Sequence, residues 1–302
     1  MTAKVKKGLT TCTIDELNFP VELRNNPMPS NKEYCKLVIG KINGEDFFLN
    51  ACSNVYELVK NESIFPRINS ILKKHKIAYD VEFTHTNNVR FYANYVITDE
   101  RLGYKMKGTN DRVQPVLRVQ HSYNGLTKYK IVFGYFRLVC SNGLVIAIEA
   151  MNKYNLCLTG KHTKAIIGSL VQLDNLLTVF ANDAKSIRKE LVDKYELLGG
   201  RIVTNVQDRV REVMMQNKLG IIENSNFNTI ENISQRILDE ANDNLFDKQG
   251  NRIILGYKGK VNDWLVYNGI NQYINDDSLN VAAPEKRQET DSKVFEYMLE
   301  NA

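Results

Sequence analysis

Runs of hydrophobic residues separated by turn residues dominate the first half of the chain, and three of them lie close together near its middle. These runs cover residues 116–120, 129–140 and 144–148, and they are rich in β-branched and aromatic residues. Tyr123-Asn124-Gly125 and Ser141-Asn142-Gly143 separate them, and Asn-Gly is the strongest short-range signal of a β-hairpin. The pattern therefore predicts an antiparallel meander of strands at the centre of the chain.

Two more strand pairs are predicted before this meander. Residues 35–42 and 46–49 flank an Asn43-Gly44 turn, and residues 81–86 and 89–98 flank an Asn-Asn turn. Strands that follow one another in this way favour an antiparallel sheet over an array of alternating strands and helices.

Helices and an N-terminal arm complete the first half. Residues 53–60 and 63–76 are predicted as short helices, and in the second of them apolar residues recur at helical spacing. Residues 1–33 are predicted to form an arm without regular structure, because Pro20, Pro27 and Pro29 interrupt any helix or strand.

The pattern changes to steps of three and four after residue 160. Apolar residues recur from Ile166 to Leu198, which predicts one long amphipathic helix that ends at Gly199-Gly200. Four further helices and a hairpin are predicted from capping residues and turn residues: a helix capped by Thr204, a helix capped by Asn228, a hairpin over residues 245–257, a helix over residues 264–274 capped by Asn262 or Asp263, and a last helix after Pro284.

Together these elements predict an α+β protein. An antiparallel β-meander sheet in the N-terminal half is packed by the long helix, and a mostly helical C-terminal region follows. The predicted division is an arm at residues 1–33, the sheet with its long helix at residues 34–200, and the helical region at residues 201–302.

Composition is that of a soluble globular protein. The 302 residues are 43% hydrophobic and 25% charged, so a substantial core is possible without disulfides or metals. No stretch approaches the roughly 20 apolar residues that cross a bilayer, and the first thirty residues have no apolar leader, so we expect a cytoplasmic protein. The five cysteines are scattered without metal-ligand spacing, and we predict no disulfide framework, metal site or cofactor.

Charge is distributed unevenly along the chain. Eight basic residues and one acid, Asp111, lie between residues 101 and 137, whereas residues 223–248 hold six acids and two bases. A basic sheet indicates an anionic partner such as nucleic acid, although surface charge also segregates without functional cause.

Catalytic interpretations are weak. Cys140 could act as a nucleophile with His121 or His162 as base, but a cysteine inside an apolar strand is normally an inert thiol. Gly160-Lys161 lacks the preceding glycine of a phosphate-binding loop, and Asp111 stands alone in the basic region, so a two-metal nuclease is not supported. We therefore predict a protein that is not an enzyme.

Four segments in order resemble one family. The segment from Phe136 to Leu144 contains Arg137, Cys140 and Asn142 and resembles the hallmark R-x-V-C-x-N of the phage and plasmid proteins described as domain of unknown function 932. The other three segments are residues 121–125, which resemble the family's histidine-containing turn, Lys161-His162-Thr163, and residues 263–273, which are similar to a late segment around a tryptophan.

The resemblance implies a protein of phages, prophages or plasmids that works in the bacterial cytoplasm on replication, repair or takeover. Its activity is unassigned. This chain departs from the family pattern at Asn124, where an acid is usual, and at Gly269 and Asn271 in the late segment. A role that depends on that acid in relatives is therefore in doubt here.

Our leading hypothesis is a protein that binds single-stranded nucleic acid, DNA or RNA, through the basic sheet. A fold-level likeness to single-strand annealing proteins adds strand annealing and self-association as expectations. The predicted contacts are Arg112, Arg118, Lys128, Lys130, Arg137, Tyr129, Tyr135, Lys161 and His162. The alternative is a structural or host-takeover protein that binds a protein partner through its acidic helical half.

Overall fold

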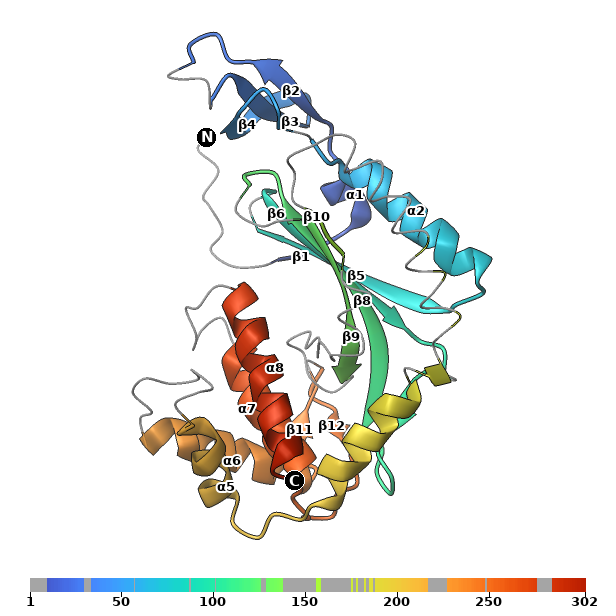
Figure 1. Ribbon diagram of the computed structural model, residues 1–302, viewed down its shortest axis with the longest axis vertical. Helices are drawn as coiled ribbons and strands as arrows, with labels where there is room; N and C mark the ends of the chain where they lie inside the picture. Colours follow the sequence, from blue (N-terminus) through green and yellow to red (C-terminus); the bar gives the residue numbers. More distant parts are fainter. Residues whose placement is uncertain are drawn as a thin grey trace. The chain divides into compact units, whose positions relative to one another are not determined.

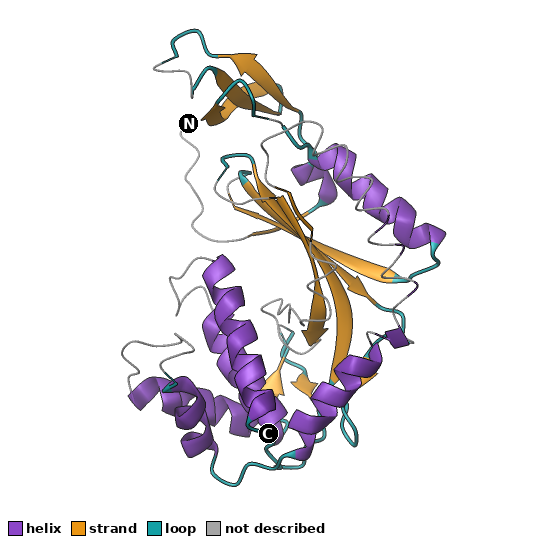
Figure 2. Ribbon diagram, viewed as in Figure 1, coloured by secondary structure: helices purple, strands orange, loops and turns teal. Residues whose placement is uncertain are grey.

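The computed structural model confirms the α+β class, with antiparallel sheets in the N-terminal half and a mostly helical C-terminal region (Figures 1 and 2). The described residues are 10–29, 34–56, 58–86, 88–100, 102–125, 129–137, 156–158, 175, 178, 182, 185–186, 188–216, 227–247, 249–275 and 284–302. Among them, no helix is long and apolar enough to cross a membrane.

The chain forms two compact units, each made of several separate stretches. Unit 1 comprises residues 1–99, 116–133 and 151–183, and unit 2 comprises residues 100–115, 134–150 and 184–302. The sequence suggests contiguous domains with boundaries at residues 33 and 200. The two units are discontinuous, so they do not test those boundaries.

Unit 1 contains one small antiparallel sheet and most of a larger one. The smaller has the order β2-β3-β4, formed by Val21–Asn25, Lys36–Ile42 and Glu45–Cys52. The predicted Asn43-Gly44 turn joins its last two strands, with φ of 53° and 85°, which these two residues tolerate well.

The larger sheet has the order β1-β5-β6-β8-β9-β10. Its strands are Thr10–Cys12, Tyr79–Thr86, Arg90–Ile97, Arg112–Ser122, Tyr129–Arg137 and Leu156–Leu158. The meander predicted near the middle of the chain is therefore confirmed for its first two strands, with the turn at residues 123–125 between them. The third predicted run, residues 144–148, lies outside the described residues.

Helix α2 (Asn61–Lys74) provides much of the core of unit 1. Ile64, Phe65 and Ile68 lie on its buried face, and the ring of Phe65 contacts that of Phe83 on β5 at 5.2 Å between centroids. The prediction of this helix from its apolar spacing is confirmed within two residues at each end.

Unit 2 is mainly helical. Its helices are residues 188–200, α5 (Val206–Met214), α6 (Phe227–Ala241), α7 (Asp263–Asn275) and α8 (Pro284–Glu300), and its short strands are β7 (Tyr104–Lys105), β11 (Leu245–Phe246) and β12 (Arg252–Ile253). Trp264, which is fully buried, contacts the rings of Tyr195 and Tyr267, and these aromatic residues form the centre of the helical core.

Several local predictions are corrected. The described residues of 53–60 contain no helix, and part of the predicted arm is regular, because β1, α1 (Ile14–Leu17) and β2 lie within it. Helix α5 is capped by Asn205, whose side chain accepts from the amide of Asp208, one residue after the predicted cap. Most of the predicted helix from residue 166 to 184 lies outside the described residues.

Candidate nucleic-acid interface

Arg137, the arginine of the family hallmark, is fully buried at the end of β9. Its Nε donates to both carboxylate oxygens of Asp111 at 2.9 Å, and its Nη2 donates to Oδ2 at 2.6 Å. Nη2 also forms an ion pair with Glu240. Because its guanidinium is fully buried and paired with two carboxylates, Arg137 is not accessible to a phosphate on the protein surface, which corrects the predicted role.

The carboxylate of Asp111 is the centre of this buried cluster. Besides Arg137, the hydroxyl of Tyr257 donates to Oδ2 at 2.6 Å and the indole of Trp264 donates to the same oxygen at 2.9 Å. Burial raises the pKa of the neighbouring Glu240, and the charge of Arg137 opposes that shift. Burying charges in this way is tolerated only when they are paired and hydrogen-bonded, so the cluster is a structural element of unit 2.

Tyr135 is also buried. Its exposed fraction is 1%, and its ring packs edge-on against Tyr195 with the centroids 6.5 Å apart. A nucleic-acid base cannot stack on a ring that is covered by the protein, so the predicted stacking role of Tyr135 is corrected as well.

The two arginines on β8 differ in exposure. Arg118 is partly buried, its Nε donates to Asn94 at 2.8 Å, and burial lowers its pKa to about 10, so it stays charged at neutral pH. Arg112 is exposed and pairs with Glu100 at 3.0 Å. Both stay predicted contacts, and each already has a partner within its own unit.

The remaining predicted contacts are not described. Lys128, Lys161 and His162 lie outside the described residues, as do Cys140 and Asn142 of the hallmark. Tyr129 and Lys130 are placed on β9, opposite Leu158 and Cys157 of β10, but their side chains are not described. The roles proposed for these residues stay predictions.

His121 of the histidine-containing turn is a buried neutral side chain. Its Nε2 donates to the amide oxygen of Asn61, and the Nδ2 of Asn61 donates to the carbonyl of Leu17 at 3.0 Å. Burial lowers the pKa of His121 to about 4. These contacts fix the start of α2 against the sheet of unit 1, and they offer no nucleophile for His121 to activate.

Four exposed lysines of unit 2 lie on two neighbouring segments. Lys105 is the last residue of β7, Lys107 follows it in the turn toward β8, and Lys258 and Lys260 belong to the loop before α7. None of these four forms an ion pair with another described residue. We refer to Lys105, Lys107, Lys258 and Lys260 as the lysine cluster.

Hydrogen bonds hold the two lysine-bearing segments side by side. The amide of Asn110 donates to the carbonyl of Leu255 at 2.7 Å, and the Nδ2 of Asn110 donates to the carbonyl of Ile254 at 3.3 Å. Asp243 fixes the second segment, because its carboxylate accepts from the amides of Leu255 and Gly256 at 2.6 and 2.9 Å. The lysine cluster is therefore displayed on an ordered backbone.

A pocket of about 320 Å³ adjoins the lysine cluster, and Lys107 is one of its lining residues. Tyr104, which is half-buried, lines another part of it and stacks on Tyr195 at an interplanar angle of 25°. The hydroxyl of Tyr104 donates to Glu196 at 3.4 Å, and burial raises its pKa to about 12. Tyr257, which also lines the pocket, is held from behind by Asp111.

Sequence reasoning counted Lys105 and Lys107 in the basic stretch but did not single out Tyr104, Lys258 or Lys260. The signal that could have found the last two is the run Gly256-Tyr257-Lys258-Gly259-Lys260, a glycine-rich turn with two cations. This run lies near Lys107 because the amide of Asn110 donates to the carbonyl of Leu255. Local sequence patterns do not reveal a hydrogen bond between residues so far apart in the chain.

The scan of protein families matches residues 48–194 to the model described as Domain of unknown function (DUF932). The chain carries a DUF932 domain. The DUF932 match includes the histidine-containing turn, the hallmark around Arg137 and the Lys161-His162-Thr163 element. The match ends before residues 263–273, so the resemblance of this late segment to the family stays a prediction. The searches of curated proteins and of solved structures found no significant match.

Arg137, which lies within the matched residues, and Trp264, which lies beyond them, both donate to Asp111. The core of unit 2 therefore joins the DUF932 domain to a residue of the C-terminal helices.

Proposed function

We propose that the protein binds single-stranded nucleic acid without changing it chemically, and that the lysine cluster contacts the phosphates. The observation that supports this proposal is the gathering of four exposed lysines without ion-pair partners among the described residues, beside a pocket that contains the half-buried ring of Tyr104. Cationic groups along the backbone and aromatic rings for the bases are the usual means of holding a single strand.

The proposed contact surface differs from the middle of the sheet that the sequence favoured. Arg137 and Tyr135 are buried, whereas Lys105 and Lys107 from the same basic stretch are exposed. Lys128, Lys130, Lys161 and His162 remain proposed contacts alongside the lysine cluster.

The ion pairs of Arg137 support a non-enzymatic role. An arginine in the family hallmark could bind an oxyanion, but Arg137 is paired with Asp111 and Glu240 instead. Following the family resemblance, we propose that binding takes place in the cytoplasm of a bacterial host, during replication or recombination of phage or plasmid DNA.

Fluorescence anisotropy with labelled dT and U oligonucleotides tests the proposal and its DNA or RNA preference. The double variant Lys107→Glu/Lys260→Glu is expected to weaken binding at least tenfold and to make the salt slope shallower by about 0.7 for each lost phosphate contact. Lys293→Glu is the matched control, since this exposed lysine of α8 is already paired with Glu289.

Unchanged affinity and slope in the double variant would remove the lysine cluster from consideration. Because the double variant reverses two charges and the control reverses one, a loss of binding free energy in the double variant that is no more than twice the loss in Lys293→Glu would show an effect of net charge alone. Strand annealing, which the fold-level likeness adds to the proposal, is measured separately by mixing complementary oligonucleotides with the protein.

A second function is favoured by exposed apolar residues in the helical half. Phe246 on β11 and Ile254 after β12 are 63% and 52% exposed, and Phe246 pairs with Arg252 across the hairpin. Under this alternative, the protein is a structural or takeover protein whose hairpin contacts a protein partner. Such binding would persist at high salt and would be lost in Phe246→Ser, whereas the lysine variants would leave it unchanged.

A further inference from the structure

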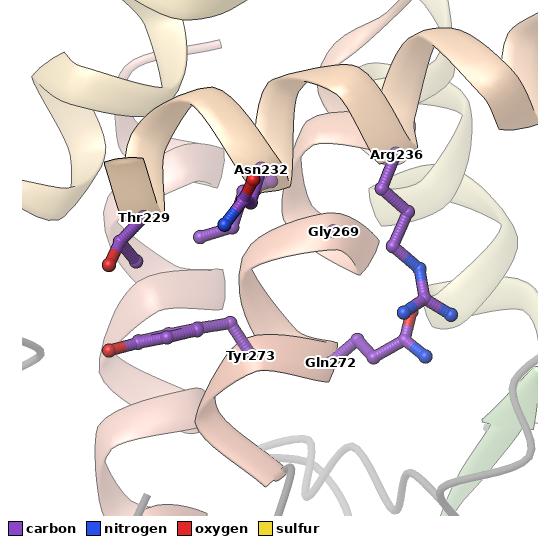
Figure 3. Close-up of a pocket in the computed structure, with 7 residues that line it drawn as sticks. Thr229, Asn232, Arg236, Gly269, Gln272 and Tyr273 are labelled. Carbon is purple, nitrogen blue, oxygen red and sulfur yellow. The ribbon is translucent and has the colours of Figure 1, made fainter. Parts of the chain in front are cut away.

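A second hollow, of about 130 Å³, lies between helices α6 and α7 of unit 2 (Figure 3). Asn232, Ile233 and Arg236 line it from α6, and Gly269, Gln272 and Tyr273 line it from α7. The hollow shares no lining residue with the pocket beside the lysine cluster. It combines an apolar floor with polar groups at its edges, which is typical of sites for small planar ligands.

Gly269 sets the depth of the hollow. A Cβ atom at this position would lie 2.6 Å from Cγ1 and 2.8 Å from Cδ1 of Ile237, so only glycine allows α7 to approach α6 this closely. The same Cβ would lie 3.5 Å from Ile233, which forms the floor with Gly269.

Gln272 presents its amide to the hollow. The residue is 8% exposed overall, and its amide forms no hydrogen bond with any residue that the structure describes. The amide can therefore offer both a donor and an acceptor to a ligand in the hollow. Figure 3 shows this amide beside the guanidinium of Arg236 at one end of the hollow.

Tyr273 forms the opposite end. Figure 3 shows its ring lying below Asn232, with a face turned toward the side chains of α6. The ring is half-buried, so one face can receive a stacked partner, and the Asn232 amide adds a second donor and acceptor at the edge. Aromatic stacking together with amide hydrogen bonds to the ring edge is how proteins read an unpaired base.

We propose that the hollow between α6 and α7 binds a nucleobase, which stacks on Tyr273 while its edge hydrogen-bonds to Gln272, Asn232 and Arg236. A phosphate ion would leave the ring of Tyr273 unused, and an aliphatic group would leave the amide of Gln272 unsatisfied. The inference does not depend on the lysine cluster, because the recognised group carries no phosphate.

Titration with adenosine, guanosine, cytidine and thymidine, followed by saturation-transfer NMR, tests the proposal on the intact protein. At least one nucleoside is expected to bind saturably, and Tyr273→Leu is expected to weaken that binding at least fivefold, whereas Tyr273→Phe keeps the stacking face and the affinity. Asn232→Ala is expected to weaken it as well. Its matched control is Glu231→Ala, an exposed neighbour that does not line the hollow.

The result that overturns the proposal is the absence of saturable binding by all four nucleosides up to their solubility limits, or equal binding by wild type and Tyr273→Leu. The variant Lys107→Glu/Lys260→Glu keeps nucleoside binding even if it loses oligonucleotide binding, so the two proposals can fail separately.

Oligonucleotides distinguish whether the base in the hollow belongs to a bound strand or to a free nucleoside. If Tyr273→Leu weakens binding of a dT oligonucleotide but not of the matching abasic strand, the hollow receives a base of a bound strand. If it changes nucleoside binding alone, the hollow receives a free nucleoside. Both results support the site and differ only in its occupant.

Discussion

The guanidinium of Arg137 and the carboxylate of Asp111 form an ion pair that is completely buried. Removing the arginine would leave Asp111 with only the Tyr257 and Trp264 donors and no compensating charge. An exposed ion pair such as Arg112–Glu100 contributes far less, because water competes for both groups.

Arg137→Met is therefore expected to lower the free energy of unfolding by about 3–5 kcal/mol, the usual cost of leaving a buried charge unpaired. Urea denaturation measures the change. Arg112→Met serves as the control and is expected to cost at most about 1 kcal/mol. Similar losses in the two variants would contradict the structural role assigned to the buried pair.

His121 makes the stability of the protein depend on pH. Its pKa falls from the ordinary 6.5 to about 4 because burial disfavours the charged form. The unfolded chain therefore binds a proton first as pH decreases, and stability present above pH 6.5 is lost between 6.5 and about 4, by about 3 kcal/mol in total. Urea denaturation over this range should show a smaller loss in His121→Gln, and equal losses would refute the assignment.

At the scale of elements, the contact between α6 and α7 depends on a missing side chain. Alanine normally favours a helix over glycine by about 1 kcal/mol. At Gly269 the added Cβ would overlap Ile237, and that clash opposes the gain in helix propensity.

Gly269→Ala is expected to destabilise the protein by about 1–3 kcal/mol, the typical cost of overpacking. In an Ile237→Ala background, where the clashing atoms are absent, the same substitution is expected to be neutral or stabilising. Thermal unfolding of wild type, Gly269→Ala, Ile237→Ala and the double variant measures the stability change in each background. A destabilisation of equal size in the two backgrounds would mean that Ile237 is not the cause.

The pair α7 and α8 contains a second titrating group, with the opposite sign. Burial raises the pKa of Asp291 from 3.8 to about 7, and hydrogen bonds from Asn271 and Tyr267 limit the shift. Its contribution is complete below pH 3.8 and is lost as pH rises through about 7, by about 4 kcal/mol. Asp291→Asn should thus gain stability relative to wild type between pH 4 and 8, as measured by urea denaturation. A constant difference would contradict the shift.

Local chemistry explains which elements the sequence predicted well. Asn43-Gly44 and the apolar spacing of α2 act through backbone preference and burial within a few residues, and both were placed correctly. The helix expected at residues 53–60 was wrong, because short apolar runs fit several conformations.

The candidate site was harder to predict, because it depends on contacts between distant residues. Net charge identified the basic stretch, but it could not show that Arg137 faces Asp111 or that Lys107 lies near the loop with Lys258. Nor could it show that Tyr135, on the same strand as Arg137, is buried.

At the scale of the whole molecule, the two units are not contiguous pieces of the chain. Strands β8 and β9 each contribute residues to both units, and Asp111 receives hydrogen bonds from residues beyond position 200. A cut at that position would remove Glu240, Tyr257 and Trp264 from the buried cluster.

A fragment of residues 1–200 is thus expected to lose the cooperative unfolding of the full chain and to be digested faster by protease, because Asp111 and Arg137 would become exposed to water. Circular dichroism during urea denaturation and limited proteolysis make the comparison. A fragment with the midpoint of the intact protein would show that the division at residue 200 is a true domain boundary.

The four-donor environment of Asp111 also limits how such proteins can be recombined. Asp111, Arg137 and the stretch with Tyr257 and Trp264 lie in three separate parts of the chain. A chimera that joins the beginning of one relative to the end of another can therefore inherit the acid and the guanidinium from one parent and the indole from the other. Hybrids should fold only when both parents supply compatible groups, and exchange of genetic segments among relatives would preserve this trio as a set.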